Sequence, residues 1–235
     1  MPSPASRIAD NLARVREQIA AAEARSGRPA GSVRLVAVTK YVGPAEAEAL
    51  LAAGCLDLGE ARPQELCRKA EALAGQPVHW HLIGHWQRNK VRRTLPHVSL
   101  VHSGDSERLL AEVDTVSGEL NLQTPVLLEV NISGDQAKGG FAPQDLENLA
   151  DRLAALRNLE IRGLMCMAGL ASGRDGTRAE FRALRTLRDR LRTIFPANLS
   201  LAELSMGMSD DFDLAIEEGA TIVRVGSALF EGVAG

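Results

Sequence analysis

Short apolar runs recur along the chain and predict β-strands, because each has the length and apolar content of a buried strand. Glycine-rich stretches at 133–140 and 169–176 follow the fifth and sixth runs and predict loops. The eight runs occupy residues 33–39, 56–59, 78–83, 98–102, 125–132, 159–167, 201–205 and 221–226.

Between these runs, apolar residues recur with helical spacing and predict amphipathic helices. Seven such segments separate the strands, at residues 45–53, 63–73, 87–95, 106–120, 143–156, 178–194 and 210–218. A further helix is predicted upstream, over residues 6–26, where Ser6 occupies an N-cap position. Its apolar stripe consists of Ile8, Leu12, Val15 and Ile19.

Strands that alternate with helices imply right-handed crossovers and a parallel sheet. Eight such units in 235 residues fit a closed barrel better than an open Rossmann or flavodoxin-like sheet, and no strand leads into a Gly-x-Gly-x-x-Gly turn. We therefore expect an α/β fold with one domain over residues 1–235. It would be a single parallel (β/α)8 TIM barrel, with the extra N-terminal helix covering one end or flank.

Composition narrows the range of partners. Hydrophobic residues make up 45% of the chain and charged residues 24%, and the formal net charge is −3. These values are close to the average for globular proteins and leave no overall basic surface for nucleic acid or an anionic membrane. We expect a monomer that binds a small molecule and has neither nucleic acid nor a membrane as a partner.

The three cysteines, Cys55, Cys67 and Cys166, lie in apolar or helical segments. Their odd number and their surroundings favour reduced thiols that serve as small core residues. The first residues lead into a charged amphipathic stretch instead of an apolar leader, and no run has the length of a membrane span. We therefore expect a cytoplasmic protein.

Lys40 ends the first apolar run and is one of only four lysines in the chain. In a parallel barrel the chemistry lies at the carboxyl ends of the strands. An amine desolvated by apolar neighbours loses its proton readily and attacks carbonyls, which is Schiff-base chemistry. Taken alone, Lys40 is better explained as an ordinary lysine whose ammonium reaches solvent from a strand end than as a Schiff-base lysine. The residues at the other strand ends therefore decide its role.

The ends of the seventh and eighth strands have the features of a phosphate site. After Ser205, a glycine turn containing Met208 and Ser209 leads directly into a helix, whose free N–H groups suit an oxyanion. Gly226 and Ser227 form a second turn beside it. Each turn alone fits ordinary helix capping, but together they predict a phosphate cup where such barrels commonly hold phosphate.

Arg224 lies inside the apolar eighth strand, where a guanidinium must find a partner. It either pairs with a neighbouring carboxylate or donates to the ring nitrogen of a ligand whose phosphate sits on Gly226 and Ser227. A lysine for an aldehyde, a cup for a phosphate and a donor for a ring nitrogen are the requirements of pyridoxal phosphate. His81 and Asn131, at the ends of the third and fifth strands, complete the predicted cofactor-binding residues.

The same motifs resemble the pyridoxal phosphate homeostasis protein family over nearly the whole chain and in the same order. The matching segments are 36–40, 81–84, 87–90, 131–133 with Lys138 and Gly140, 162–165, 205–211 and 223–230.

This resemblance implies the barrel of the alanine racemase N-terminal domain with pyridoxal 5'-phosphate as cofactor. Lys40 would carry the internal aldimine and Arg224 would face the pyridine nitrogen. The phosphate would be held by Met208, Ser209, Gly226 and Ser227. Members are regarded as cofactor carriers or regulators without an established catalytic reaction, and apo forms of pyridoxal phosphate enzymes would be the recipients.

The chain departs from the family pattern at three places. Gly59-Glu60-Ala61-Arg62 stands where relatives commonly have Gly-Glu-Asn-Tyr. His85 and Trp86 replace a smaller residue and a leucine, and Tyr41 follows Lys40. We expect an unusual rim around the cofactor.

An amino-acid racemase or decarboxylase of the same barrel lineage is the first alternative. Two-base racemisation needs an acid/base group on each face of the cofactor, commonly lysine and tyrosine. The only tyrosine is Tyr41, next to Lys40, which disfavours that reaction. Weak transamination or slow single-base proton exchange by Lys40 stays open.

Two further alternatives rest on histidines and arginines. His79 and His81, with His85 and His102, suggest a metal-dependent hydrolase, although Glu60 is the only carboxylate at a neighbouring strand end. The simpler interpretation is that His81 lines the pocket and His79 caps the strand. A nucleic-acid binder or scaffold would use the arginines of the helix at 178–194, which have the spacing of a solvated face opposite a core stripe. They are Arg178, Arg182, Arg185, Arg188 and Arg192.

Overall fold

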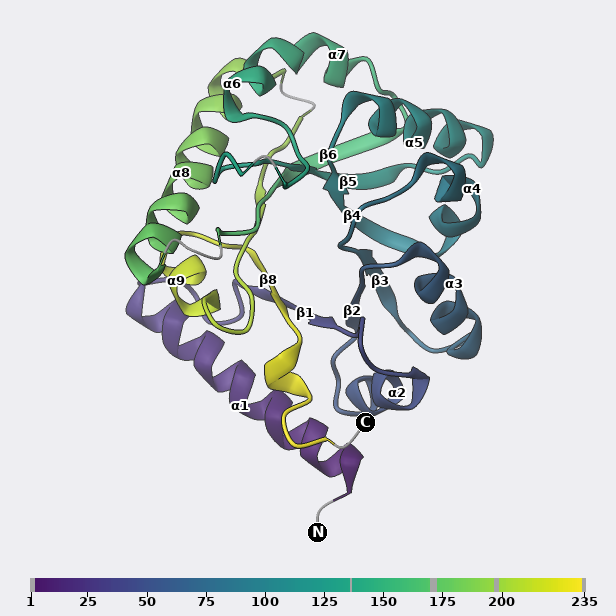
Figure 1. Ribbon diagram of the computed structural model, residues 1–235, viewed down its shortest axis with the longest axis vertical. Coiled ribbons are helices and arrows are strands. Elements are labelled where there is room, and N and C mark those ends of the chain that lie inside the picture. Colours follow the sequence, from purple (N-terminus) through teal and green to yellow (C-terminus); the bar gives the residue numbers. More distant parts are fainter. Residues whose placement is uncertain (1–2, 136, 170–172, 197–198, 234–235) are drawn as a thin grey trace.

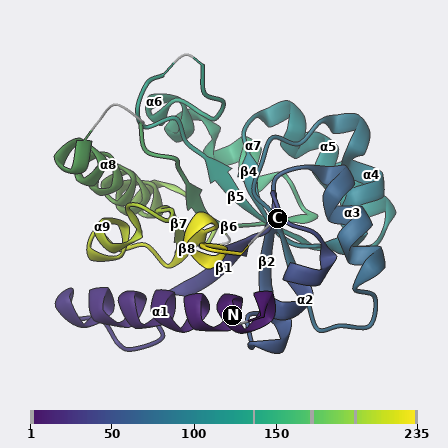
Figure 2. The same cartoon turned by 60° about the horizontal axis from the view of Figure 1, so that its bottom comes forward.

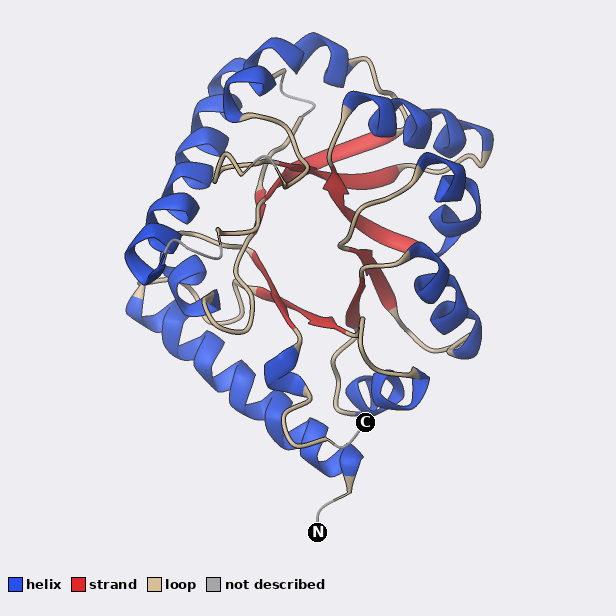
Figure 3. Ribbon diagram, in the orientation of Figure 1, coloured by secondary structure: helices blue, strands red, loops and turns tan. Residues whose placement is uncertain are grey.

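Eight parallel strands form a closed barrel in the computed structural model, with helices around its outside (Figures 1 and 3). The structure describes residues 3–135, 137–169, 173–196 and 199–233. Each strand pairs with the next in sequence, and β8 pairs with β1 to close the ring, which confirms the predicted fold class. The strands are β1 (Arg34–Val38), β2 (Asp57–Glu60), β3 (His79–Leu82), β4 (Val98–Gly104), β5 (Thr124–Glu129), β6 (Leu159–Met165), β7 (Glu203–Ser205) and β8 (Ile222–Val225).

Helical segments occupy the connections between the strands (Figure 1). The α-helices are α1 (Pro4–Arg25), α2 (Pro44–Ala52), α3 (Pro63–Ala72), α4 (Val91–Thr94), α5 (Glu107–Glu119), α6 (Pro143–Leu146), α7 (Ala150–Ala154), α8 (Gly173–Ile194) and α9 (Phe212–Glu217). Within the described residues, four short 3-10 segments accompany them, η1 (Arg88–Lys90), η2 (Leu95–His97), η3 (Glu147–Leu149) and η4 (Ser227–Leu229).

Two predicted helices are broken into shorter pieces. The segment predicted at 87–95 consists of η1, α4 and η2, and Pro96 within η2 cannot donate a backbone hydrogen bond. The segment predicted at 143–156 consists of α6, η3 and α7. Conversely, the helix predicted from 178 already begins at Gly173.

The barrel interior has an apolar layer and a polar layer. One buried cluster takes a single residue from each of five strands and is separate from the larger core between strands and helices. Because side chains alternate along a strand, the residues two positions further on face the same interior. These include the polar side chains of His102, Glu129 and Arg224, so chemistry is concentrated toward the carboxyl ends. The apolar cluster consists of Val36, Leu100, Leu127, Met165 and Ile222.

Helix α1 lies along the flank of the barrel, packed against α2, α9 and η4 (Figures 1 and 2). In the described part of the chain, β8 is followed only by the short segment η4, and α1 fills the position in the ring of helices where a longer helix would otherwise follow β8. Its buried Asn11 donates through Nδ2 to the carbonyl oxygens of Leu229 (3.1 Å) and Glu231 (3.0 Å). The extra helix therefore completes the outer layer at a flank and fixes the segment that follows β8.

The long helices α1 and α8, each of 22 residues, are amphipathic. No helix in the described ranges is both long enough and apolar enough to cross a lipid bilayer. The arginine face of α8 is less solvated than the sequence suggested, because three arginines converge on Glu218, whose side chain is only 5% exposed. These ion pairs, from Arg178, Arg182 and Arg185, join α8 to the end of α9. Three of the five arginines on that face therefore bind one and the same carboxylate of this chain.

Candidate functional site

Lys40 directly follows β1 at the carboxyl end of the barrel and is half-buried. Its Nζ lies 4.9 Å from the centre of the Tyr41 ring, and the side chain makes no hydrogen bond or ion pair with any described residue. Tyr41 itself is 86% exposed. The predicted strand-end lysine is therefore an amine that lies over the Tyr41 ring but makes no hydrogen bond or ion pair with a described residue.

A different lysine, Lys69 of α3, is the buried one. It is 1% exposed, and its Nζ donates to the carbonyl oxygen of Thr39 at 2.6 Å and lies 3.4 Å from Glu60 Oε2. Burial lowers the pKa of Lys69 and raises the pKa of Glu60, and the opposite charge of the partner counteracts each shift. The pair anchors the residue immediately before Lys40. Sequence reasoning missed it, although Lys69 stands near Leu66 and Cys67 on the buried side of α3.

Arg224 is 4% exposed inside the barrel. It donates from Nη1 to Ser205 Oγ at 2.5 Å and from Nη2 to the carbonyl oxygen of Cys166 at 2.9 Å. Burial lowers the pKa of Arg224. Of the two roles predicted for it, pairing with a carboxylate is not seen among the described residues. The guanidinium keeps further N–H groups for a ligand in the barrel mouth.

The two turns predicted to form a phosphate cup touch each other. Ser209 Oγ accepts a hydrogen bond from the Gly226 amide at 3.2 Å, which joins the loop after β7 to the loop after β8. Gly207 has φ +93°, and a Cβ there would meet Ala215 Cβ at 2.6 Å, so only glycine fits this turn. Among the backbone amides of these loops, those of Ser209, Asp210, Ser227 and Ala228 donate to no described group.

The helix after this cup is shorter than predicted. It begins at Phe212 instead of Asp210, because the Asp211 carboxylate accepts the Met208 amide at 2.6 Å and the preceding residues form a turn. A helix of six residues has a small dipole. The cup therefore depends on the free loop amides, which can each donate to a phosphate oxygen.

Six of the predicted residues gather at one edge of the barrel. Strands β7, β8 and β1 are neighbours, and Lys40, Met208, Ser209, Arg224, Gly226 and Ser227 lie on them or directly after them. Ser205, the last residue of β7, accepts a hydrogen bond from Arg224 inside the barrel. Asn131 is set apart, since its Nδ2 donates to the carbonyl oxygens of Asp135 (2.9 Å) and Lys138 (3.4 Å) and shapes the loop after β5.

The histidines considered for a metal site do not converge on one position, although His81 and His102 touch. His85 is exposed and its Nδ1 lies 2.8 Å from Asp105, whereas His79 is exposed at the start of β3. His81 is buried and contacts Asp57 and His102 inside the barrel. Over the parts of the chain that the structure describes, no group of three His, Cys, Asp or Glu side chains is arranged to hold a metal ion.

Glu129, which the sequence reasoning missed, ends β5 on the opposite side of the mouth. It is 8% exposed and makes no hydrogen bond to a described residue through its side chain. Burial and the Asp105 charge raise the pKa of its carboxyl, while Arg224 and His85 oppose the shift. A glutamate at the end of an apolar strand, two residues after the inward-facing Leu127, was the available signal.

The unusual rim residues are only partly at the rim. His85 lies there, paired with Asp105, but Trp86 is 1% exposed and packs in the core. The prediction that Trp86 alters the rim is therefore wrong, because its large apolar ring is buried among the core residues. Arg62 forms the N-cap position of α3.

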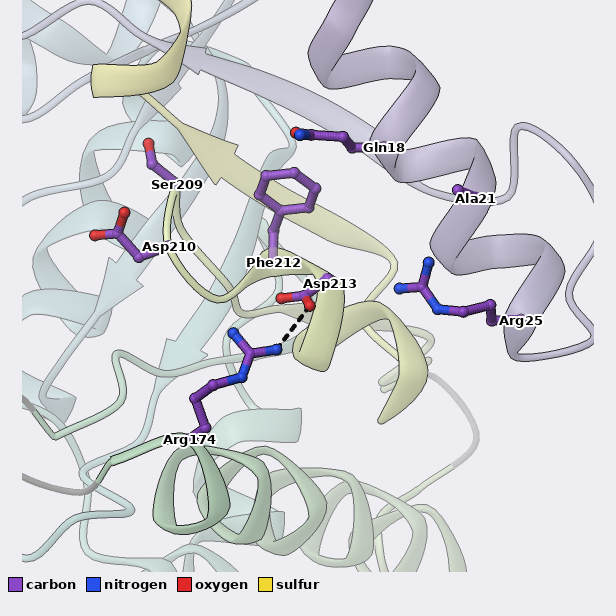
Figure 4. Close-up of a pocket in the computed structure, with 8 residues that line it drawn as sticks. All are labelled: Gln18, Ala21, Arg25, Arg174, Ser209, Asp210, Phe212 and Asp213. Carbon is purple, nitrogen blue, oxygen red and sulfur yellow. Dashed lines mark hydrogen bonds and ion pairs between the residues drawn. The ribbon is translucent and has the colours of Figure 1, made fainter.

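A groove of about 330 Å³ lies beside the cup, between α1 and α9 (Figure 4). Arg174 bridges it by an ion pair of 2.9 Å to Asp213. Its lining includes Ser209 but neither Lys40 nor Arg224. This groove is on the outer flank and does not hold the chemistry of the barrel mouth.

Comparison with known proteins identifies the family. The protein-family model described as alanine racemase, N-terminal domain, matches residues 10–233 of the sequence. A pyridoxal phosphate homeostasis protein of Pseudomonas aeruginosa is 42% identical over 229 residues, which cover 96% of this chain and 95% of the relative.

Solved structures agree with this. PipY of Synechococcus elongatus PCC7942, solved with PLP bound, has a TM-score of 0.83 and 37% identity, covering 95% of this chain and 99% of that chain. An alanine racemase of Corynebacterium glutamicum has a TM-score of 0.74 at 19% identity over 98% of this chain and 62% of its own, which shows a shared fold alone. This chain therefore belongs to the pyridoxal phosphate homeostasis protein family, built on the barrel of the alanine racemase N-terminal domain.

Proposed function

We propose that this chain binds pyridoxal 5'-phosphate covalently through Lys40 and acts in its intracellular homeostasis as a carrier. One observation carries the proposal: a free lysine amine, a buried arginine donor and two loops with free amides lie on three adjacent strand ends. These groups match the aldehyde, the ring nitrogen and the phosphate of one small molecule. The PLP-bound PipY relative supports this assignment.

Each residue then has a defined task. The cofactor would supply an electrophilic aldehyde, and the Lys40 amine would hold it covalently. The amides of Ser209, Asp210, Ser227 and Ala228 would donate to the phosphate, and Ser209 holds the two loops together. Arg224 donates to the ring nitrogen. Because a guanidinium does not give up its proton, Arg224 would keep the ring nitrogen unprotonated and weakly electron-withdrawing, which would favour storage over turnover.

Delivery to other proteins completes the proposed role. Recipients would be apo forms of pyridoxal phosphate enzymes, which supply a lysine amine to take over the aldehyde. We place this exchange in the cytoplasm and assign it to a monomer. The three cysteines are all free and buried, which fits a reducing compartment.

The test begins with uptake of the cofactor. Adding pyridoxal phosphate to the purified protein should produce the visible absorption of a lysine imine, and borohydride reduction with peptide mapping should place the added mass on Lys40. Lys40→Arg should abolish both signals, whereas Lys90→Arg, at a partly exposed lysine elsewhere, should keep them. A protein that stays colourless and unmodified would rule out the proposal.

Delivery requires a second measurement. The loaded protein should restore activity to an apo pyridoxal phosphate enzyme in the presence of a phosphatase that destroys free cofactor. Reactivation no better than that given by free cofactor would reduce the role to binding alone.

A racemase-like activity is a second candidate, favoured by Glu129. This carboxyl lies across the mouth from Lys40 and provides an acid/base group that no tyrosine supplies. Incubation of the loaded protein with amino acids in deuterated water should show whether deuterium enters at Cα. Exchange that depends on both Lys40 and Glu129 would favour this candidate over a carrier.

A further inference from the structure

A continuous line of hydrogen bonds crosses the interior of the barrel. Arg224 Nη1 donates to Ser205 Oγ at 2.5 Å, and Ser205 Oγ lies 2.8 Å from His102 Nδ1. His102 Nε2 lies 2.9 Å from His81 Nδ1, and His81 Nε2 lies 3.0 Å from Asp57 Oδ1. Five side chains from five different strands thus form one continuous line of hydrogen bonds.

The proton order along this line follows from its acidic end. Asp57 has a pKa below its usual value: partial burial would raise the pKa, but the His81 hydrogen bond and nearby positive charges outweigh that effect. An ionised carboxylate only accepts, so His81 must carry its proton on Nε2. Its Nδ1 then accepts from His102 Nε2–H. His102 Nδ1 is left as an acceptor for the Ser205 hydroxyl hydrogen.

The basic end is compatible with the same order. Arg224 can only donate, so Ser205 Oγ must offer it a lone pair and direct its own hydrogen elsewhere. Its other neighbour in the line is His102 Nδ1, which accepts that hydrogen. With neutral imidazoles, the ionised Asp57 therefore sets one direction, from Arg224 to Asp57, for the three groups between the two charged ends.

Both imidazoles must be neutral for this order. A proton on His81 Nδ1 would face the His102 Nε2–H, and a proton on His102 Nδ1 would face the Ser205 O–H. Burial lowers the pKa of His81 and lowers the pKa of His102 further. At His102 the Arg224 charge adds to the effect, as would a positive charge on His81. The other charged groups acting on the line are Arg34 and His79 near its acidic end and Glu129 and Asp211 near Arg224. Arg34, like Arg224, disfavours a second positive charge on the imidazoles.

The two ends of the line face opposite ends of the barrel. Asp57 is the first residue of β2, and its side chain is 26% exposed. It borders a cavity of about 250 Å³ together with Arg34, His79 and Arg162 at the amino ends of the strands. Arg224 lies near the carboxyl end of β8, beside the proposed cofactor site.

We propose that Asp57 is a positioning residue for the cofactor site, acting through His81, His102 and Ser205 to hold Arg224 as a donor to the ring nitrogen. The inference rests on the proposed function for its effect on the cofactor. The order of protons along the line is independent of any ligand. A substitution of Asp57, at the amino ends of the strands, would then change how firmly the cofactor is held at the carboxyl ends.

The first test uses the unloaded protein with ¹⁵N-labelled histidine. At neutral pH, His81 and His102 should both show a protonated Nε2 and an unprotonated Nδ1 in their NMR spectra. Asp57→Leu should replace these with averaged shifts of exchanging tautomers. Asp57→Asn, which keeps an acceptor oxygen, and Glu160→Gln, which removes an exposed charge on β6, outside the line, should preserve them. A wild-type signal from Nδ1–H on either ring would overturn the proposal.

The second test follows release of the cofactor from the loaded protein to a scavenging apoenzyme. Asp57→Leu and Ser205→Ala should each accelerate release roughly 3- to 10-fold, as expected for the loss of one hydrogen-bonded support. Asp57→Asn and Glu160→Gln should remain within about twofold of wild type. Unchanged release in Asp57→Leu, with only a lower melting temperature, would reduce Asp57 to a structural role and overturn the proposal.

The two tests separate this inference from the proposed function. If the wild-type protein takes up no pyridoxal phosphate, the proposed function fails, and with it the positioning of a cofactor donor. The NMR spectra then still decide the proton order: fixed Nε2–H tautomers uphold the line from Asp57 to Arg224, and mixed tautomers reject it.

Discussion

Lys69 Nζ donates a hydrogen bond of 2.6 Å to the carbonyl oxygen of Thr39, the residue directly before Lys40. The same ammonium faces the buried carboxylate of Glu60 at 3.4 Å. One buried pair from α3 and β2 thus fixes the end of β1, from which Lys40 projects. The lysine proposed to react makes no hydrogen bond with a described residue at its tip, and the residue before it is anchored by Lys69.

Replacing Lys69 by methionine should strongly destabilise the protein. The substitution leaves Glu60 buried without a countercharge, which typically costs about 3–5 kcal/mol. Chemical denaturation with the unfolding free energy as readout would measure this loss. The Lys40 adduct should also form less completely, because Thr39 loses its anchor.

The double variant Lys69→Met/Glu60→Gln provides the control. Removing both charges should recover most of the lost stability, because no uncompensated buried charge is left. Its yield of Lys40 adduct should stay low, since the Thr39 contact is still missing. Full recovery of adduct formation would show that the hydrogen bond to Thr39 does not position Lys40.

Gly207→Ala should disrupt the loop after β7. The glycine has φ +93°, and an added Cβ would lie 2.6 Å from Ala215 Cβ and 2.9 Å from Phe212 Cα. Backbone strain and overpacking together predict a loss of roughly 2–4 kcal/mol. Affinity for pyridoxal phosphate should fall at least tenfold, as measured by equilibrium titration, because the displaced loop carries half of the cup.

Gly31→Ala is a matched control for this effect. Gly31 has φ +75° but no atom within 4 Å of an added Cβ, and it lies in the loop before β1. We expect only the backbone cost, about 1 kcal/mol, with unchanged cofactor affinity. Equal losses of affinity in both variants would argue against a specific role of the β7 loop.

Glu129→Gln should stabilise the unloaded protein at neutral pH. The folded-state pKa of Glu129 is raised, so the fold favours the neutral carboxyl and is penalised by its ionised form. This penalty disappears as pH falls through the folded-state pKa. The gap in melting temperature between Glu129→Gln and wild type should therefore be largest at neutral pH and close in acid. A gap independent of pH would contradict the assignment.

Glu218 should contribute to acid sensitivity. Burial would raise its pKa, but hydrogen bonds from Arg182 and Arg178 outweigh that effect and lower it below the ordinary 4.5. A lowered carboxylate pKa stabilises the fold above the unfolded-state value, and the contribution is lost as pH falls through the folded-state pKa. Glu218→Gln should cost about 1–3 kcal/mol at neutral pH and flatten the acid limb of the stability profile. An unchanged acid limb would contradict this.

The fold was largely predictable because its signals are local. Strand and helix periodicities within windows of ten to twenty residues indicated eight strands, and their strict alternation indicated a parallel barrel. Segment ends were less certain, as the broken helices around Pro96 and at 143–156 show. Those ends depend on competing hydrogen bonds, such as the Asp211 carboxylate that takes the Met208 amide.

Lys40, Arg224 and the two glycine turns were predictable as site residues, because unusual residue types at strand ends are visible without a fold. The supports behind them were not. His102 and Ser205 meet across 103 positions, and Lys69 reaches Thr39 across 30. No periodicity encodes such a contact, since it exists only when the barrel closes and removes both groups from water.

The sequence by itself therefore determined the architecture and the chemistry offered at the strand ends. Only the tertiary structure decided which lysine is free and which is buried, where Glu129 faces, and how Asp57 connects to Arg224. The physical reason is that pairing, burial and proton order are properties of neighbours in space, and strand closure chooses those neighbours from distant parts of the chain.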